Sequence, residues 1–333
     1  MDKFKKIRAY RLGFILPLID YLIIWPVLVI LKRRTATALQ LQFLGNKAEI
    51  EKDIRHGAFF MTNHRDICMD ATWLTFLLRN HYFIHPYSGI GNNLFGKWWI
   101  QHVVRTLRAF VVIRNGSFRE QLMNATILSE YIRTLRKRHK SIWLAQREGR
   151  AKDGNDVTQP GVLKMLTIDS KDFFEGIKEL NICPVSISYE YDPCDYLKAR
   201  EMQLKRDNPQ WKKSRKDDLI SMQVGINGQK GRIVYRLTPS INHEIDRMLI
   251  EHPELREKSR NEQIQYVCQL IDRHIHQGYE MYERGKTFDE YIESRIKLIN
   301  LSNKDTDYLR ERLYEMYNYP VENYNKAINN TII

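Results

Sequence analysis

Polar segments follow three strand-like runs of this sequence, and their residue types suit proton transfer and the binding of phosphate. The segments are residues 62–70 (TNHRDICMD), 114–116 (RNG) and 146–154 (QREGRAKDG). In open α/β sheets, ligands bind beyond the carboxyl ends of the strands. We therefore expect the three segments to converge on one cleft.

The first of these segments contains one histidine and two aspartates. A carboxylate that keeps one imidazole nitrogen protonated leaves the other nitrogen free to accept a proton from a hydroxyl group. We expect His64 to act as this base and Asp70 to orient it, with Asp66 as a rival for the orienting role. The alternative is that an aspartate only caps the following helix and that His64 is a structural hydrogen bonder.

Four ordered blocks of the chain resemble those of the glycerolipid acyltransferase family, which includes glycerol-3-phosphate and 1-acylglycerol-3-phosphate acyltransferases. The blocks are Asn63-His64-Arg65 with its downstream aspartate, and residues 110–114, 148–150 and 182–187. The resemblance covers roughly residues 57–190. It implies an O-acyltransferase that moves a fatty acyl group from a thioester to the hydroxyl of glycerol phosphate or lysophosphatidic acid in phospholipid synthesis.

The same resemblance assigns roles to individual residues. His64 and Asp70 would be catalytic, and Arg114 and Arg150 would bind the acceptor phosphate. The residues implied at the substrate are Asn63, Arg65, Arg114, Glu148, Gly149, Arg150 and Lys152. No metal or redox cofactor is implied, and the co-substrate would be an acyl carrier protein or coenzyme A thioester.

Two positions depart from the family pattern. Asp70 lies one residue further from His64 than in the family, and Ala151 stands where the family has an arginine, so Arg150 or Lys152 must supply that charge. Because these changes predict a weaker phosphate site, an amino-acid-containing lyso-lipid is an alternative acceptor. A non-catalytic peripheral membrane-binding protein is the alternative from another class.

The N-terminal part of the chain combines an apolar stretch with basic clusters. The whole protein has a formal charge of +13, and residues 1–34 carry +6, from eight Lys or Arg against two Asp. Residues 12–31 are long enough to span a bilayer, but Pro17, Asp20 and Pro26 favour a broken helical hairpin or an interfacial segment. We expect attachment to the anionic cytoplasmic face of the cell membrane, peripheral or anchored by residues 12–31, with a buried core helix as the alternative.

Short β-rich runs alternate with longer amphipathic stretches, which is typical of an α/β domain. We expect a mixed, largely parallel sheet flanked by helices, with an N-terminal membrane-associated helical segment (residues 1–40), an acyltransferase domain (41–242) and a helical C-terminal extension (243–333). The predicted elements are strands at 58–62, 109–113, 141–145 and 182–189, helices at 71–78 and 117–135, a hairpin at 222–237 and helices only after 243.

Other chemistries receive less support from the residues. The four cysteines include no C-x-x-C pair, which fits a reducing compartment and argues against a disulfide framework. Cys68 near His64 suggests a nucleophile, and His81 with His85 suggests metal ligands, but a buried thiol and structural histidines are the commoner explanations. The basic run 133–140 lacks a recognised nucleic-acid motif, so we expect no nucleic-acid partner.

Overall fold

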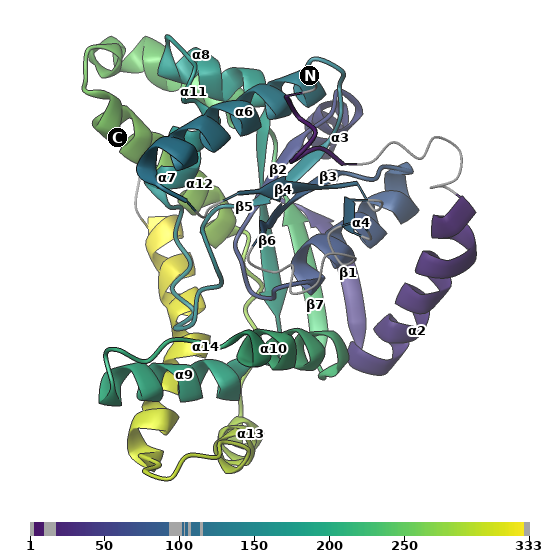
Figure 1. The fold of residues 1–333 in the computed structure, drawn as a ribbon, viewed down its shortest axis with the longest axis vertical. Helices are drawn as coiled ribbons and strands as arrows, with labels where there is room; N and C mark the ends of the chain where they lie inside the picture. The colour runs from purple at the N-terminus through teal and green to yellow at the C-terminus, as the bar shows by residue number, and fades with distance from the viewer. Residues whose placement is uncertain are drawn as a thin grey trace.

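The computed structural model describes residues 3–9, 18–92, 102, 104–105, 108–113 and 116–329. Its centre is a seven-stranded sheet with the strand order β1-β7-β6-β2-β5-β3-β4 (Figure 1). The strands are β1 (Ala38–Phe43), β2 (Phe59–Thr62), β3 (Tyr87–Gly91), β4 (Ala109–Val112), β5 (Ile142–Ala145), β6 (Ile182–Tyr189) and β7 (Arg232–Leu237).

Five neighbouring strands of the sheet run in one direction. β6, β2, β5, β3 and β4 are mutually parallel, whereas β7 is antiparallel to β6 and parallel to β1. The carboxyl ends of β2, β5 and β6 therefore meet at one edge of the sheet. This mostly parallel mixed sheet, flanked by helices, confirms the predicted α/β class.

Helices cover both faces of the sheet (Figure 1). Helices α6, α7, α8, α11 and α12 contribute to one hydrophobic core, and α3 and α4 contribute to the other. Their bounds, together with those of the remaining helices, are α2 (Trp25–Thr35), α3 (Lys47–Arg55), α4 (Met69–Tyr82), α6 (Phe118–Arg136), α7 (Pro160–Leu166), α8 (Phe173–Leu180), α9 (Asp195–Asp207), α10 (Arg215–Asn227), α11 (Asn242–Glu251), α12 (Arg260–Gln277), α13 (Lys286–Lys297) and α14 (Thr306–Asn329).

The four strands and two helices predicted from the apolar runs are present, with ends shifted by a few residues. The capping box at the start of α6 forms as expected, because Ser117 accepts from the Glu120 amide and Glu120 reaches back to the Ser117 amide. The expectation of helices only after residue 243 also holds for the described residues. α12 packs on β6, so this helical part shares the core of the sheet.

The predicted hairpin at 222–237 is wrong. Residues up to Asn227 belong to α10, which starts at a capping box formed by Ser214 and Asp217. Gly228 is the C-terminal cap of that helix, and β7 then pairs with β1 and β6, not with the residues before it. The Asn-Gly pair thus ends a helix here, since the partners of β7 come from distant parts of the chain.

The N-terminal helix lies at the outside of the molecule, next to β1 (Figure 1). A π-helical turn (Asp20–Ile24) leads into α2, and the buried Asp20 carboxylate accepts from Arg79 of α4 and lies 3.5 Å from the His85 ring. The boundary expected at residue 40 falls inside β1. Among the described helices, none has both the length and the apolarity required to cross a bilayer; residues 12–17 of the apolar stretch lie outside the described residues.

A single glycine tests the placement of α10. A Cβ added at Gly225 would lie 2.1 Å from Asp66 Oδ2, so α10 must pack directly on the Asp66 carboxylate. An ordinary Gly→Ala change inside a helix stabilises by about 1 kcal/mol. We expect Gly225→Ala instead to lower the free energy of unfolding by about 1–3 kcal/mol, because the buried carboxylate cannot move away freely.

Urea unfolding of the purified protein measures this effect. Gly161→Ala in α7 is the matched control, because an added Cβ meets nothing within 4 Å there. If Gly225→Ala is at least as stable as Gly161→Ala, α10 does not lie against Asp66.

Candidate active site

The first polar segment brings a histidine and a buried carboxylate together at the end of β2. His64 Nδ1 lies 2.9 Å from Asp70 Oδ2, and Asp70 is fully buried in the first turn of α4. An ionised carboxylate only accepts hydrogen bonds, so Nδ1 carries the proton and Nε2 has a free lone pair. The His64 side chain is 15% exposed, and none of the described residues bonds to Nε2.

The Asp70 carboxylate is held from several sides. Its Oδ2 also accepts from the backbone amides of Arg65 (2.7 Å) and Asp66 (3.0 Å), and its Oδ1 accepts from the Tyr189 hydroxyl at 3.0 Å. Burial raises the pKa of Tyr189 well above its usual value, so this phenol remains a donor. The Tyr235 hydroxyl fixes the backbone by donating to the Asp70 carbonyl oxygen at 2.9 Å. The carboxylate position is therefore determined by β2, α4, β6 and β7 together.

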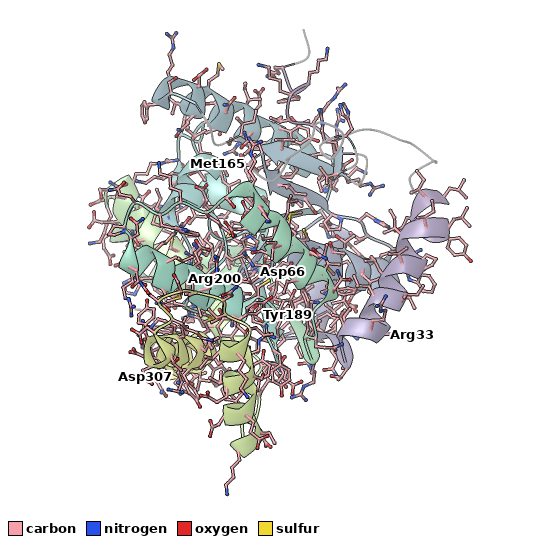
Figure 2. The ribbon with its side chains drawn as sticks, turned by 60° about the horizontal axis from the view of Figure 1, so that its bottom comes forward. Arg33, Asp66, Met165, Tyr189, Arg200 and Asp307 are labelled. Carbon is pink, nitrogen blue, oxygen red and sulfur yellow. The ribbon has the colours of Figure 1, made fainter. Side chains whose placement is uncertain are left out.

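Asp66 has a different role from Asp70. Its Oδ1 accepts from the amides of Cys68 (2.9 Å) and Met69 (2.8 Å), where it caps the start of α4. Burial and the neighbouring Asp70 raise the pKa of Asp66, with Arg150 opposing them. Of the two aspartates, Asp70 is therefore the one that contacts the imidazole, and Asp66 caps the helix. Both Asp66 and Tyr189, labelled in Figure 2, are buried.

The segment that follows β5 converges on the same histidine. The His64 amide donates to Asp156 Oδ2 at 2.7 Å, and the His64 carbonyl oxygen accepts from the Ala151 amide at 3.2 Å. Asp156 is fully buried and also receives the amide of the Gln146 side chain at 3.4 Å. Two of the three polar segments therefore meet, as predicted. Arg114, from the second segment, lies outside the described residues.

Asn63 is placed differently from the prediction that it binds substrate. Its side chain is fully buried, donates to the Ile187 carbonyl oxygen at 2.9 Å and accepts from the Ile187 amide at 2.7 Å. Both polar atoms of the amide group are thus used within the protein. Asn63 thus joins the end of β2 to β6 next to His64.

The predicted phosphate ligands of the third block already have acidic neighbours. Burial lowers the pKa of Arg150, but Cys194 and then Asp66 and Asp192 outweigh this effect, so that the pKa is raised. Lys152 forms an ion pair with Glu201 of α9, and burial lowers its pKa. Glu148 is exposed, and Gly149 adopts a φ of 70° in an open turn. The charge of Lys152 is therefore compensated by an ion pair, whereas Arg150 has acidic neighbours but no ion pair among the described residues, and its Nη1 is buried without a hydrogen-bond partner among them.

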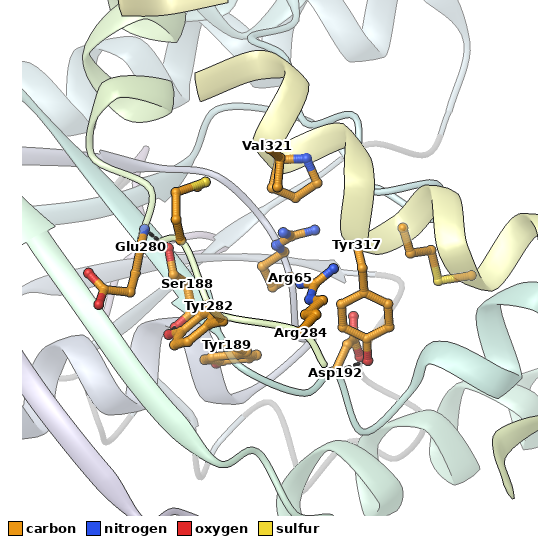
Figure 3. Close-up of a pocket in the computed structure, with 12 residues that line it drawn as sticks. Arg65, Ser188, Tyr189, Asp192, Glu280, Tyr282, Arg284, Tyr317 and Val321 are labelled. Carbon is orange, nitrogen blue, oxygen red and sulfur yellow. Dashed lines mark hydrogen bonds between the residues drawn. The ribbon is translucent and has the colours of Figure 1, made fainter. Parts of the chain in front are cut away.

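Arg65, which follows His64 in the chain, and Tyr189, which donates to Asp70, line a nearby cavity (Figure 3). The prediction that Arg65 lies at a binding site agrees with this position, because its side chain lines the cavity. Arg284 and Tyr317, from the chain after residue 243, line the same cavity and were not anticipated. Neither belongs to a local motif, so the sequence offered no signal for them. Tyr189 is the last residue of the predicted strand 182–189, at the carboxyl edge of the sheet, and this position could have identified it as a residue of the site.

The other chemistries considered for this region find little support in the geometry. Burial raises the pKa of Cys68 to about 12, so its thiol stays protonated at neutral pH and is a weak nucleophile. His85 lies against Asp20 and Arg79, not in a ligand cluster. Within the described parts of the chain, no group of three or more His, Cys, Asp or Glu could hold a metal ion.

No protein-family model matches this chain, and no curated protein matches it significantly.

The Asn63 contacts predict a structural phenotype. Asn63→Ala leaves the buried amide and carbonyl oxygen of Ile187 without partners, and we expect the free energy of unfolding to fall by about 2–4 kcal/mol. Chemical denaturation measures the change, with Asn303→Ala as the control because that side chain is exposed. An Asn63→Ala protein of unchanged stability would contradict this structural role.

Proposed function

We propose that this protein is an O-acyltransferase that transfers a fatty acyl group from an acyl carrier protein or coenzyme A thioester to the hydroxyl of a glycerol-phosphate-type acceptor. The observation that carries the proposal is the His64–Asp70 contact of 2.9 Å at the end of a parallel strand, with Nε2 left open. The choice of an acyl thioester as donor and of a phospholipid precursor as acceptor comes from the resemblance of the four blocks.

In the proposed reaction, Nε2 of His64 removes the proton of the acceptor hydroxyl while the oxygen attacks the thioester carbonyl carbon. The tetrahedral intermediate then collapses, the carbon–sulfur bond breaks, and the imidazolium returns its proton to the leaving thiolate. Asp70 holds the tautomer and stabilises the imidazolium that forms transiently. The acyl group passes directly from sulfur to oxygen, so no acyl-enzyme is required.

Substitution of the three site residues tests the base and its partner. We expect His64→Ala to lower kcat/KM by a factor of about 10²–10⁴, because general base catalysis is lost. Asp70→Asn should approach this loss, since an amide no longer stabilises the imidazolium. Asp66→Asn is the matched control and should keep most of the activity, because it caps α4 without contacting His64.

Thiol release from a short-chain acyl thioester gives the rates, and thermal unfolding shows which variants are folded. Retained activity in a folded His64→Ala protein removes His64 as the base. A loss in Asp66→Asn as large as that in Asp70→Asn would contradict the assigned division of roles.

We further propose that the N-terminal helix attaches the protein to the anionic cytoplasmic face of the cell membrane. One face of this helix packs on the domain through Trp25, Leu28 and Val29. Six large apolar side chains on the helical segment are nevertheless exposed: Leu18, Tyr21, Leu22, Ile23, Val27 and Ile30. Three basic residues, Lys32, Arg33 and Arg34, lie in its last turn. This combination fits an interfacial helix that inserts apolar side chains between anionic headgroups.

Vesicle co-sedimentation tests the proposed membrane contact. In the double variant Ile23→Glu/Val27→Glu we expect binding to phosphatidylglycerol vesicles to weaken by a factor of about 10–100, because two charges replace inserting side chains. Ile250→Glu is the control, since Ile250 is 80% exposed on α11, away from this helix. Equal binding by both variants would show that another surface meets the lipid.

A further inference from the structure

The cavity beside the histidine–aspartate pair is built from both halves of the chain (Figure 3). Arg65 contributes from the segment after β2 and Tyr189 from the end of β6, whereas Arg284 precedes α13 and Tyr317 lies on α14. Tyr189 also donates to Asp70 Oδ1. A ligand in this cavity would therefore lie next to the groups that orient His64.

The two arginines of the cavity form no ion pair among the described residues, although burial of Arg65 is offset by the nearby charges of Asp156 and Asp192, which help to keep its pKa raised. Within the described chain, neither guanidinium makes a hydrogen bond or an ion pair, and Arg284 Nε is buried without an acceptor. The Arg284 guanidinium stacks on the rings of Phe288 (4.7 Å) and Tyr317 (4.5 Å), which fixes its plane. Burial lowers the pKa of Arg284, and the nearby charge of Arg65 adds to this effect. Two like charges at one cavity are unfavourable unless an anion lies between them.

The acidic residues of the cavity wall are already engaged. Asp192 Oδ1 accepts from the Cys194 amide at 2.8 Å, and Asp192 Oδ2 accepts from Lys198 Nζ at 2.5 Å. Burial alone would raise the pKa of Asp192, but Lys198 and then Arg65 outweigh it and hold this pKa below its usual value. Glu280 forms ion pairs with Arg236 and Arg232 of β7. Both carboxylates thus have closer cations of their own, and Arg284 is the cation of the cavity that has no carboxylate among the groups acting on its pKa.

We propose that Arg65 and Arg284 together bind the phosphate monoester of the acyl acceptor, so that the chain after residue 243 completes the acceptor site. This proposal rests on the proposed acyltransferase function and names the residues that recognise its acceptor. Guanidinium groups suit this role because their planar forks match two phosphate oxygens at a time. The assignment also gives the acceptor phosphate a cation that replaces Lys152, whose charge is paired with Glu201.

Binding of sn-glycerol 3-phosphate to the full-length protein, measured by calorimetry, tests this site without requiring catalysis. We expect Arg65→Gln and Arg284→Gln each to weaken binding by about tenfold or more, and Arg284→Lys to restore part of it, because a charge returns without the fork. Arg256→Gln is the control, since Arg256 pairs with Asp172 on another face of the molecule. Thermal unfolding checks that each variant is folded.

The outcomes separate the two proposals. Unchanged binding in folded Arg65→Gln and Arg284→Gln variants overturns the subsite, even if the enzyme transfers acyl groups. Binding that depends on both arginines supports the subsite. If the wild-type protein shows this binding but transfers no acyl group, the proposed function is contradicted and the subsite is not. Inorganic phosphate is the second probe. If it displaces glycerol 3-phosphate at equal concentrations, the site binds the free ion, and the acceptor assignment is overturned. Much weaker competition by inorganic phosphate supports the acceptor assignment.

Discussion

The structure around the candidate active site depends on the burial of one carboxylate. Asp70 is removed from water, and an ionised carboxylate in such a position is stable only when several donors surround it. Two amides, the Tyr189 hydroxyl and the His64 ring supply those donors, and the first turn of α4 adds a favourable helix dipole. Three strands and one helix must therefore be in place before the histidine is oriented.

Three further acids, of which Asp66 and Asp156 are buried and Asp192 is half-buried, fix the loops around this centre. Asp66 caps α4, Asp156 holds the His64 amide, and Asp192 accepts from Lys198, whose ammonium also donates to the Arg65 carbonyl oxygen at 3.1 Å. Each of these acids joins segments that are distant in the sequence or stabilises a loop that leaves the sheet. The imidazole is thus carried by a backbone with little freedom, which is what a positioned base requires.

Much of the fold was predictable because local patterns agreed with the final contacts. The apolar run of β6 is buried at every position, and the Ser117–Glu120 capping box marks the start of α6 in sequence and structure alike. The hairpin failed because an Asn-Gly pair ends helices as well as forming turns. β1 and β3 were missed; β1 alternates only weakly between buried and exposed residues.

The sequence predicted which residue types form the site, but not which residues they contact. Sequence spacing identified His64 and two candidate aspartates, yet it could not decide between them, since both lie near the start of one helix. The pairing of Lys152 with Glu201 and the approach of Arg284 to Arg65 depend on segments far apart in the chain. Such long-range contacts leave no local pattern, so the sequence could not foresee that Asn63 bonds to Ile187 or that Lys152 pairs with Glu201.

The most direct test of the account is a single-turnover reaction with a radiolabelled acyl thioester. The purified protein is mixed with the thioester alone and with the thioester plus sn-glycerol 3-phosphate or lysophosphatidic acid, and protein-bound and lipid-bound label are counted. The account predicts label in an ester of the acceptor, release of one thiol for each ester, and no labelled protein when the acceptor is omitted. A covalently acylated protein, or no ester with either acceptor, would contradict it.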